Sequence, residues 1–230
     1  VCFSAMIPQR DSLFAAAARC RRPGKLVIFG GPYPSSSPDE CVPHCDVMVL
    51  DEAEAVLPAL LADLARGTPQ ARYPMSGDKP DVTGSPTPRF DLLRVNDYTM
   101  IPIQLSRGCP FQCEFCNAPI VFGRKPRVKT PEQVLRELDA LFATGYRGLI
   151  FIVDDNLIGN KKELRRLLPA LQAWNRAHGD PFLYTAEASV NLADDEALLA
   201  AMAASRFSGV FLGIETPSVE SLRETRKLQN

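Results

Sequence analysis

Three cysteines lie close together in one short stretch of the sequence, at a spacing that suits an iron–sulfur cluster. Cys109, Cys113 and Cys116 follow the pattern C-x3-C-x2-C, directly after the apolar run 101–105. A cubane cluster is normally held by four cysteine thiolates, so three without an obvious fourth would leave one iron without a protein ligand. Because an open metal position is where a metal acts on a substrate, the triplet indicates a catalytic cluster.

Two other interpretations of the triplet remain open. A structural zinc ion prefers four Cys or His ligands, and the chain has only His44 and His178, both distant from the triplet in the sequence. A closed electron-transfer cluster would need a fourth cysteine from among Cys2, Cys20, Cys41 and Cys45. No spacing supports such a partner, so a non-catalytic iron–sulfur or zinc protein is kept as an alternative.

The overall composition is that of an ordinary globular protein. The chain has 230 residues, 46% of them hydrophobic and 23% charged, with a net charge of −1, which gives no electrostatic reason to expect a nucleic-acid partner. No apolar run approaches the length of a transmembrane helix. The chain begins with Val1 and ends with Asn230, and we expect it to be a fragment. An odd number of cysteines, three of them clustered, favours a reducing cytoplasm over a disulfide framework.

The pattern of apolar residues divides the chain into three predicted zones. In residues 1–70, buried-strand runs at 26–29 and 47–50 alternate with helical patterns, which predicts a parallel sheet. The second run is followed by apolar positions at helical spacing, which end before Gly67: Val56, Leu57, Leu60, Leu61 and Leu64. Residues 71–98 are rich in proline among Gly, Ser, Thr and Asp, so we expect a linker on the surface.

Residues 99–230 predict four successive βα units, with strands at 101–105, 149–153, 182–186 and 210–214. Thr130, Pro131 and Gln133 suggest a helix start with a capping box, Asn160 with Glu163 a second helix start, and Thr216-Pro217 a third. Such units build a barrel or half-barrel, whose site gathers at the C-terminal ends of the strands. Polar residues follow these ends: Asp154, Asp155, Asn156, Glu187, Ser189 and Glu215. One acidic residue after a strand is more often a helix cap, but the combination with the cysteine triplet favours a shared site.

The cysteine loop after the first strand of a partial barrel resembles the signature of the radical S-adenosylmethionine (SAM) superfamily, and Phe115 before the last cysteine fits it. The resemblance implies a [4Fe–4S] cluster on Cys109, Cys113 and Cys116, with SAM chelated to the fourth iron. Reductive cleavage of SAM, with electrons from a donor such as a flavodoxin or ferredoxin, would give a 5′-deoxyadenosyl radical.

The resemblance also assigns roles to the residues at the strand ends. Where the family usually has Gly-Gly-Glu, this chain reads Val153-Asp154-Asp155-Asn156, so Asp154, Asp155 or Asn156 would meet the amino group of SAM. The contacts to the ribose or the methionine part would come from Glu187, Ser189 and Glu215.

Residues 1–70 resemble the C-terminal half of a Rossmann-like cobalamin-binding domain in the runs 3–6, 29–32 and 51–54. This resemblance implies that cobalamin is bound by Ser4, Gly30, Gly31 and Glu52. Asp51 departs from the family's common Gly-Glu-x-Glu run, and ordinary turns after the strands are the alternative interpretation.

The runs 154–162 and 213–217 further resemble the group that contains hopanoid C-2 methylases. We therefore expect an α/β protein in which the C-terminal half of a Rossmann-like cobalamin-binding domain (1–70) and a proline-rich linker (71–98) precede part of a (β/α)6 radical SAM barrel (99–230). The resemblance implies methylation of an unreactive carbon in a small-molecule or lipid substrate, such as a hopanoid-type lipid. A radical cyclase or rearrangement enzyme is the alternative. The enzyme would be cytoplasmic, and peripheral to the membrane if its substrate is a lipid.

Overall fold

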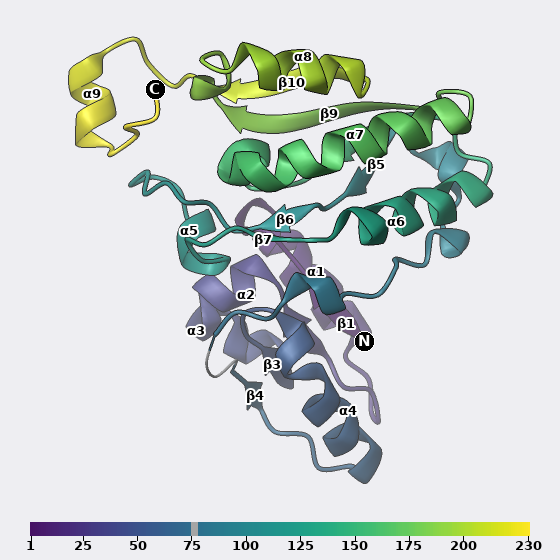
Figure 1. The fold of residues 1–230 in the computed structure, drawn as a ribbon. Helices are drawn as coiled ribbons and strands as arrows, with labels where there is room; N and C mark the ends of the chain where they lie inside the picture. The colour runs from purple at the N-terminus through teal and green to yellow at the C-terminus, as the bar shows by residue number, and fades with distance from the viewer. Residues whose placement is uncertain (75–77) are drawn as a thin grey trace. The chain divides into compact units, whose positions relative to one another are not determined.

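The computed structural model describes residues 1–74 and 78–230, and it divides into two compact units, residues 1–80 and 81–230 (Figure 1). Within the described residues, each unit is built on a parallel four-stranded sheet with helices between the strands. The predicted α/β class with parallel sheets is confirmed.

The strands of the first unit lie in the order in which they occur in the chain. They are β1 (Cys2–Ser4), β2 (Ile28–Gly30), β3 (Val47–Val49) and β4 (Arg72–Tyr73). The helices between them are η1 (Ile7–Gln9), α1 (Arg10–Cys20), α2 (Pro32–Ser36), α3 (Pro38–Cys41), η2 (Val42–His44), η3 (Ala53–Ala55) and α4 (Leu57–Arg66).

The two central strands, β2 and β3, are buried on both faces, which explains why they are continuous apolar runs rather than alternating ones. Phe29 packs with Met48 and with Leu13 of α1 on one face, whereas Ile28 belongs to a second cluster with Leu60 of α4. Helix α4 ends at a left-handed Gly67, as predicted. Its predicted apolar face is only partly right, because Leu57 and Leu61 are exposed.

The segment predicted as a surface linker contributes to both units. β4 pairs with β3 in the first unit, while Val82 and Phe90 are buried in the second. The Gln133 side chain donates hydrogen bonds to the carbonyls of Val82 and Ser85, which binds this part of the segment to helix α6 (Pro131–Ala143) of the second unit. Proline disfavours regular elements but does not prevent single apolar side chains from packing. Residues 75–77 of the predicted linker lie outside the described residues.

The sheet of the second unit has the order β10-β9-β8-β5. Its strands are β5 (Met100–Ile103), β8 (Gly148–Ile152), β9 (Phe182–Ser189) and β10 (Phe207–Gly213). The short strands β6 (Ser106–Arg107) and β7 (Arg127–Val128) pair antiparallel on either side of the cysteine loop. The helices are η4 (Val82–Gly84), η5 (Phe90–Leu92), η6 (Val95–Asp97), α5 (Ala118–Val121), α6 (Pro131–Ala143), η7 (Leu157–Asn160), α7 (Lys161–Ala177), η8 (Val190–Leu192), α8 (Glu196–Ala204) and α9 (Val219–Glu224).

The core of the second unit lies between the sheet and its helices. Helix α7 has α6 and α8 as neighbours, and the three helices pack their leucines onto the apolar side chains of the strands (Figure 1). Within this sheet, strands that follow one another along the chain are neighbours, so the predicted series of βα units is confirmed. This order places the C-terminal ends of four parallel strands at one edge.

Two of the predicted helix starts need correction. Thr130 Oγ1 accepts a hydrogen bond from the Gln133 N–H, but no capping box forms, because the Gln133 side chain is used elsewhere. The last helix does not open at Thr216-Pro217. Glu215 has a φ of 62°, which turns the chain, and α9 starts later with Ser218 as its N-cap. The predicted Asn160 cap is confirmed.

None of the helices in residues 1–74 and 78–230 is both long enough and apolar enough to cross a membrane.

Candidate active site

A cavity of about 200 Å³ lies in the second unit at the C-terminal ends of its strands, and it brings together residues from separate βα units. The cysteine loop contributes Cys109, Cys113 and Cys116 to the lining. The strand ends contribute polar side chains from β9 and from the residues just after β8 and β10. Of the residues predicted for this site, all but Asp154 line the cavity: Cys109, Cys113, Phe115, Cys116, Asp155, Asn156, Glu187, Ser189 and Glu215.

Asp154 holds the base of the cysteine loop instead. Its side chain is only 3% exposed, and its two oxygens accept hydrogen bonds from the Leu105 N–H at 2.7 Å and the Ser106 hydroxyl at 2.6 Å. Burial disfavours the ionised carboxylate and raises the pKa of Asp154 to about 6, although these hydrogen bonds oppose the rise. Asp154 therefore joins the end of β8 to the entrance of the loop.

The loop itself is held by a close backbone approach at Gly108. A Cβ atom at this position would lie 2.8 Å from the Gly123 carbonyl oxygen, and the φ of 101° favours glycine. The Gly108 N–H donates to Asp155 Oδ2 at 2.8 Å, and the Cys109 N–H donates to the Gly123 oxygen at 3.1 Å. Asp155 thus supports the loop and also lines the cavity.

The three loop cysteines are free thiols. Cys109 is buried, which raises its pKa, and the neighbouring Cys116 and Cys113 act in the same direction. Among the described residues, no three His, Cys, Asp or Glu side chains surround one point as ligands of a single metal ion would. In a cubane each thiolate binds a different iron, so three cysteines around one cavity fit such a cluster without meeting at a point.

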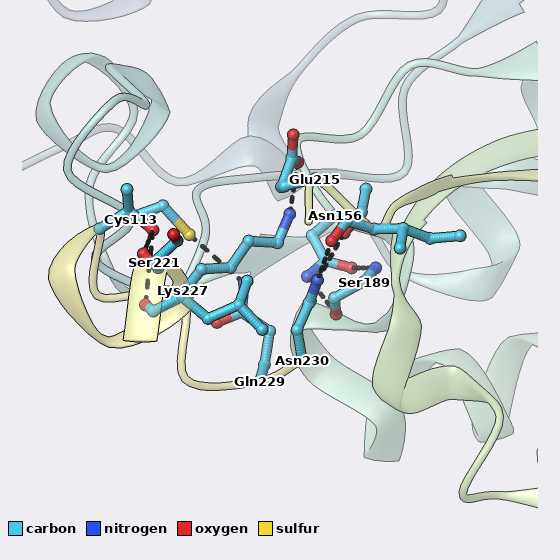
Figure 2. A network of polar contacts seen from close by, with 12 residues as sticks. Cys113, Asn156, Ser189, Glu215, Ser221, Lys227, Gln229 and Asn230 are labelled. Carbon is cyan, nitrogen blue, oxygen red and sulfur yellow. Dashed lines mark hydrogen bonds and ion pairs between the residues drawn. The ribbon is translucent and has the colours of Figure 1, made fainter. Parts of the chain in front are cut away.

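The ends of β8 and β9 are joined by a buried polar contact inside the site (Figure 2). Asn156 Nδ2 donates to Ser189 Oγ at 3.0 Å, and Ser189 Oγ donates to Asn191 Oδ1 at 2.7 Å. The Asn156 oxygen also accepts from the Ile158 N–H. These bonds fix the orientation of two side chains that line the cavity.

Two polar residues that sequence reasoning did not predict also line the cavity. Lys227 is buried, and its Nζ lies 2.6 Å from Glu215 Oε1 and 5.7 Å from the centre of the Phe115 ring. Figure 2 shows the Lys227 side chain extended toward Glu215. Gln229 Nε2 donates to Cys113 Sγ at 3.3 Å. A lysine in a charged run usually covers a solvated helix face, and no motif marks the run 227–230, so spacing could not have found either residue.

In the first unit, the residues predicted to bind cobalamin gather at the C-terminal edge of the sheet. Ser4 ends β1 and is paired in register with Gly30, the last residue of β2. A Cβ atom at Gly31, where φ is 89°, would clash with the Ser4 hydroxyl. Glu52 follows β3 and is buried. The absence of a side chain at Gly31 therefore makes room for Ser4, and the binding roles of these residues stay predictions.

Comparison with known proteins gives one family match and several relatives. Residues 103–230 match the model of the radical SAM superfamily. An uncharacterized methyltransferase of Synechocystis sp. is 48% identical over 100% of this chain and 43% of its own length. The hopanoid C-2 methylase of Rhodopseudomonas palustris is 37% identical over 92% of this chain and 41% of its own length. The chain thus spans less than half of each of these relatives.

A solved structure has the same fold. The cobalamin-dependent SAM radical enzyme OxsB, with aqua-cobalamin and SAM bound, superposes with a TM-score of 0.76 at 18% identity, over 98% of this chain and 37% of that one. The family model covers more than half of the chain, including the cysteine loop and the ends of β8, β9 and β10. The chain therefore belongs to the radical SAM superfamily and has the fold of a cobalamin-dependent member.

Proposed function

We propose that this protein is a cobalamin-dependent radical SAM enzyme that methylates an unreactive carbon of its substrate. The observation that carries the proposal is the shared cavity, in which three cysteines face polar side chains from three strand ends. The relatives support it, since those at 48% and 37% identity are named a methyltransferase and a methylase.

In this proposal residues 1–70 are the C-terminal half of a Rossmann-like cobalamin-binding domain, 71–98 a linker, and 99–230 part of a (β/α)6 barrel. The parallel strands in chain order support this assignment, as does the likeness to OxsB.

When bound, the cluster and cobalamin supply the electron that cleaves SAM and the methyl group that is transferred. The residues of the chain hold and orient these groups. Cys109, Cys113 and Cys116 would hold three irons, and Asp155 or Asn156 would meet the amino group of SAM. The ribose or methionine contacts would come from Glu187, Ser189 and Glu215, with Phe115 at the cavity wall, and the cobalamin contacts from Ser4, Gly30, Gly31 and Glu52.

Asn156 is held in one orientation by its bond to Ser189, and its oxygen accepts from the Ile158 and Ser189 N–H groups. Asp154 is not proposed as a SAM contact, because both of its oxygens are used at the base of the loop. Lys227 compensates the charge of Glu215, and both residues line the cavity.

For the substrate we propose a lipid, with a hopanoid-type lipid as the first compound to try, because the methylase at 37% identity is named for hopanoids. Such a substrate would place a cytoplasmic enzyme at the membrane surface. A flavodoxin or ferredoxin would provide the electrons.

The test uses the full-length protein, with cluster and cobalamin loaded, a reductant, and SAM that carries a deuterated methyl group. We expect mass spectrometry to find the deuterated methyl group on a carbon of the lipid, and to find none with the Cys116→Ala variant. An isomer of the substrate without an added methyl group would contradict methylation and support a radical rearrangement. A protein that binds zinc, or a cluster indifferent to SAM, would contradict radical chemistry altogether.

A further inference from the structure

A hydrogen bond reaches one of the cluster cysteines from a residue far along the chain. Gln229 Nε2 lies 3.3 Å from Cys113 Sγ, although the two residues are 116 positions apart (Figure 2). Gln229 lines the same cavity as the three cysteines. A glutamine amide can both donate and accept, whereas a thiolate that binds iron has no hydrogen to donate. Once Cys113 is a ligand, only the amide nitrogen can face it.

The backbone on either side of Gln229 is tied to the site. After α9 the chain turns at Arg226, where φ is 55°, and Lys227 and Gln229 of the segment 226–230 line the cavity. Before Gln229, Lys227 is anchored on Glu215. After it, the Asn230 side chain donates to the carbonyls of Gly213 at 3.0 Å and Ile214 at 2.8 Å.

The cysteine loop is also bonded directly to the chain just before the segment 226–230. The N–H of Glu114, next to Cys113, donates to the Thr225 carbonyl at 2.9 Å. This backbone hydrogen bond, made just before the segment 226–230 begins, therefore limits the distance between the loop and that segment. The contacts of Lys227, Asn230 and Glu114 therefore hold the Gln229 amide next to Cys113.

Hydrogen bonds to the sulfur ligands are one of the factors that set the reduction potential of an iron–sulfur cluster. A donor at Cys113 Sγ withdraws negative charge from the cluster, and the reduced cluster carries one more negative charge than the oxidised one. The bond is therefore stronger in the reduced state, as hydrogen bonds to more strongly charged acceptors are. The cluster becomes easier to reduce.

We propose that Gln229 raises the reduction potential of the cluster through its hydrogen bond to Cys113. Gln229 acts through Cys113 and touches neither SAM nor substrate in this role. The proposal rests on the proposed function only in requiring the [4Fe–4S] cluster on the three cysteines.

The test compares the full-length protein, reconstituted with iron and sulfide and without SAM, with two variants. Gln229→Met keeps the length of the side chain and removes the donor, and Gln229→Asn withdraws the amide by one methylene group. The control is Gln172→Met in α7, which removes a glutamine hydrogen bond to the Ala204 carbonyl outside the cavity lining. The fraction of reduced cluster is measured by electron paramagnetic resonance (EPR) at a series of fixed potentials.

We expect the ratio of reduced to oxidised cluster at a given potential to fall about tenfold in Gln229→Met, equivalent to about 59 mV for a one-electron couple. Gln229→Asn should shift in the same direction, and Gln172→Met should match the unmodified protein. Equal potentials in all four proteins would overturn the proposal while leaving the cluster in place. Loss of the cluster from both Gln229 variants would overturn it too, because Gln229 would then be needed to hold the cluster. If the unmodified protein assembles no [4Fe–4S] cluster, the proposed function itself fails.

Discussion

Replacing Asp154 by asparagine should remove a pH dependence from the stability of the second unit. In the folded protein, burial holds the pKa of Asp154 at about 6, above its ordinary value of 3.8, and the nearby Asp155 acts in the same direction. Between these two values the folded protein keeps a proton that the unfolded chain has lost. The free energy of unfolding must therefore fall as the pH rises through this range.

The size of the effect follows from the two pKa values. A difference of about two corresponds to about 3 kcal/mol, present in full below pH 3.8 and lost once the pH exceeds about 6. In Asp154→Asn the amide oxygen can still accept from the Leu105 N–H, and the amide nitrogen can donate to the Ser106 hydroxyl, so both contacts survive without a titratable group.

The assay is urea unfolding of the cluster-free, reduced full-length protein between about pH 4 and pH 8, with and without the substitution. The difference in the free energy of unfolding, original protein minus Asp154→Asn, should decrease by about 3 kcal/mol across this range. A difference that stays flat would mean that Asp154 is ionised in the folded protein at all these values. A difference that increases with pH would mean that the hydrogen bonds to the carboxylate outweigh burial, and either result would refute the burial argument.

Three other predictions concern packing around the two sites. Lys129→Met should lower the free energy of unfolding by about 3–5 kcal/mol, because it leaves Glu137 buried without the cation that lies 2.6 Å away. Arg166→Met removes a more exposed ion pair with Glu163 and should lower the free energy of unfolding by less than about 1 kcal/mol. Urea unfolding measures both losses, and equal losses would contradict the greater weight given to the buried pair. Thr130→Ala should cost about 1 kcal/mol through the lost N-cap of α6, measured in the same way, and no change would show that the cap bond is worth nothing here. Gly31→Ala should lower both thermal stability and cobalamin retention. The added methyl group would clash with the Ser4 hydroxyl, and the positive φ of this residue is unfavourable for alanine. Unchanged cobalamin retention would argue against binding at this edge of the sheet.

The sequence was sufficient to predict the parts of the fold that depend on local pattern. Apolar runs ended by glycine and helix starts capped by Thr130 and Asn160 depend on neighbours in the chain, so they were found within a few residues of their true bounds. The capping box failed because the Gln133 amide nitrogen donates to two carbonyls about 50 positions away, and the amide oxygen does not reach back to the Thr130 N–H as the box requires. That choice is made by tertiary packing and leaves no trace in the spacing.

The residues of the candidate site also fall into those that local pattern predicts and those that depend on tertiary packing. The cysteines and strand-end residues could be predicted because a parallel sheet brings successive strand ends to one edge. Their separate tasks could not: Asp154 and Asp155 are neighbours with similar chemistry just after β8, yet Asp154 binds the base of the loop, whereas Asp155 binds Gly108 and also lines the cavity. Lys227 and Gln229 were missed because only the turn at Arg226 returns them to the cysteines.

The most direct test of the central claim, a cluster with one open iron in the cavity, is EPR spectroscopy of the anaerobically reconstituted and reduced full-length protein. We expect a [4Fe–4S]⁺ signal that changes when SAM is added and that disappears in the Cys113→Ala variant. A signal that ignores SAM, or a protein that takes up zinc in place of iron, would contradict the claim.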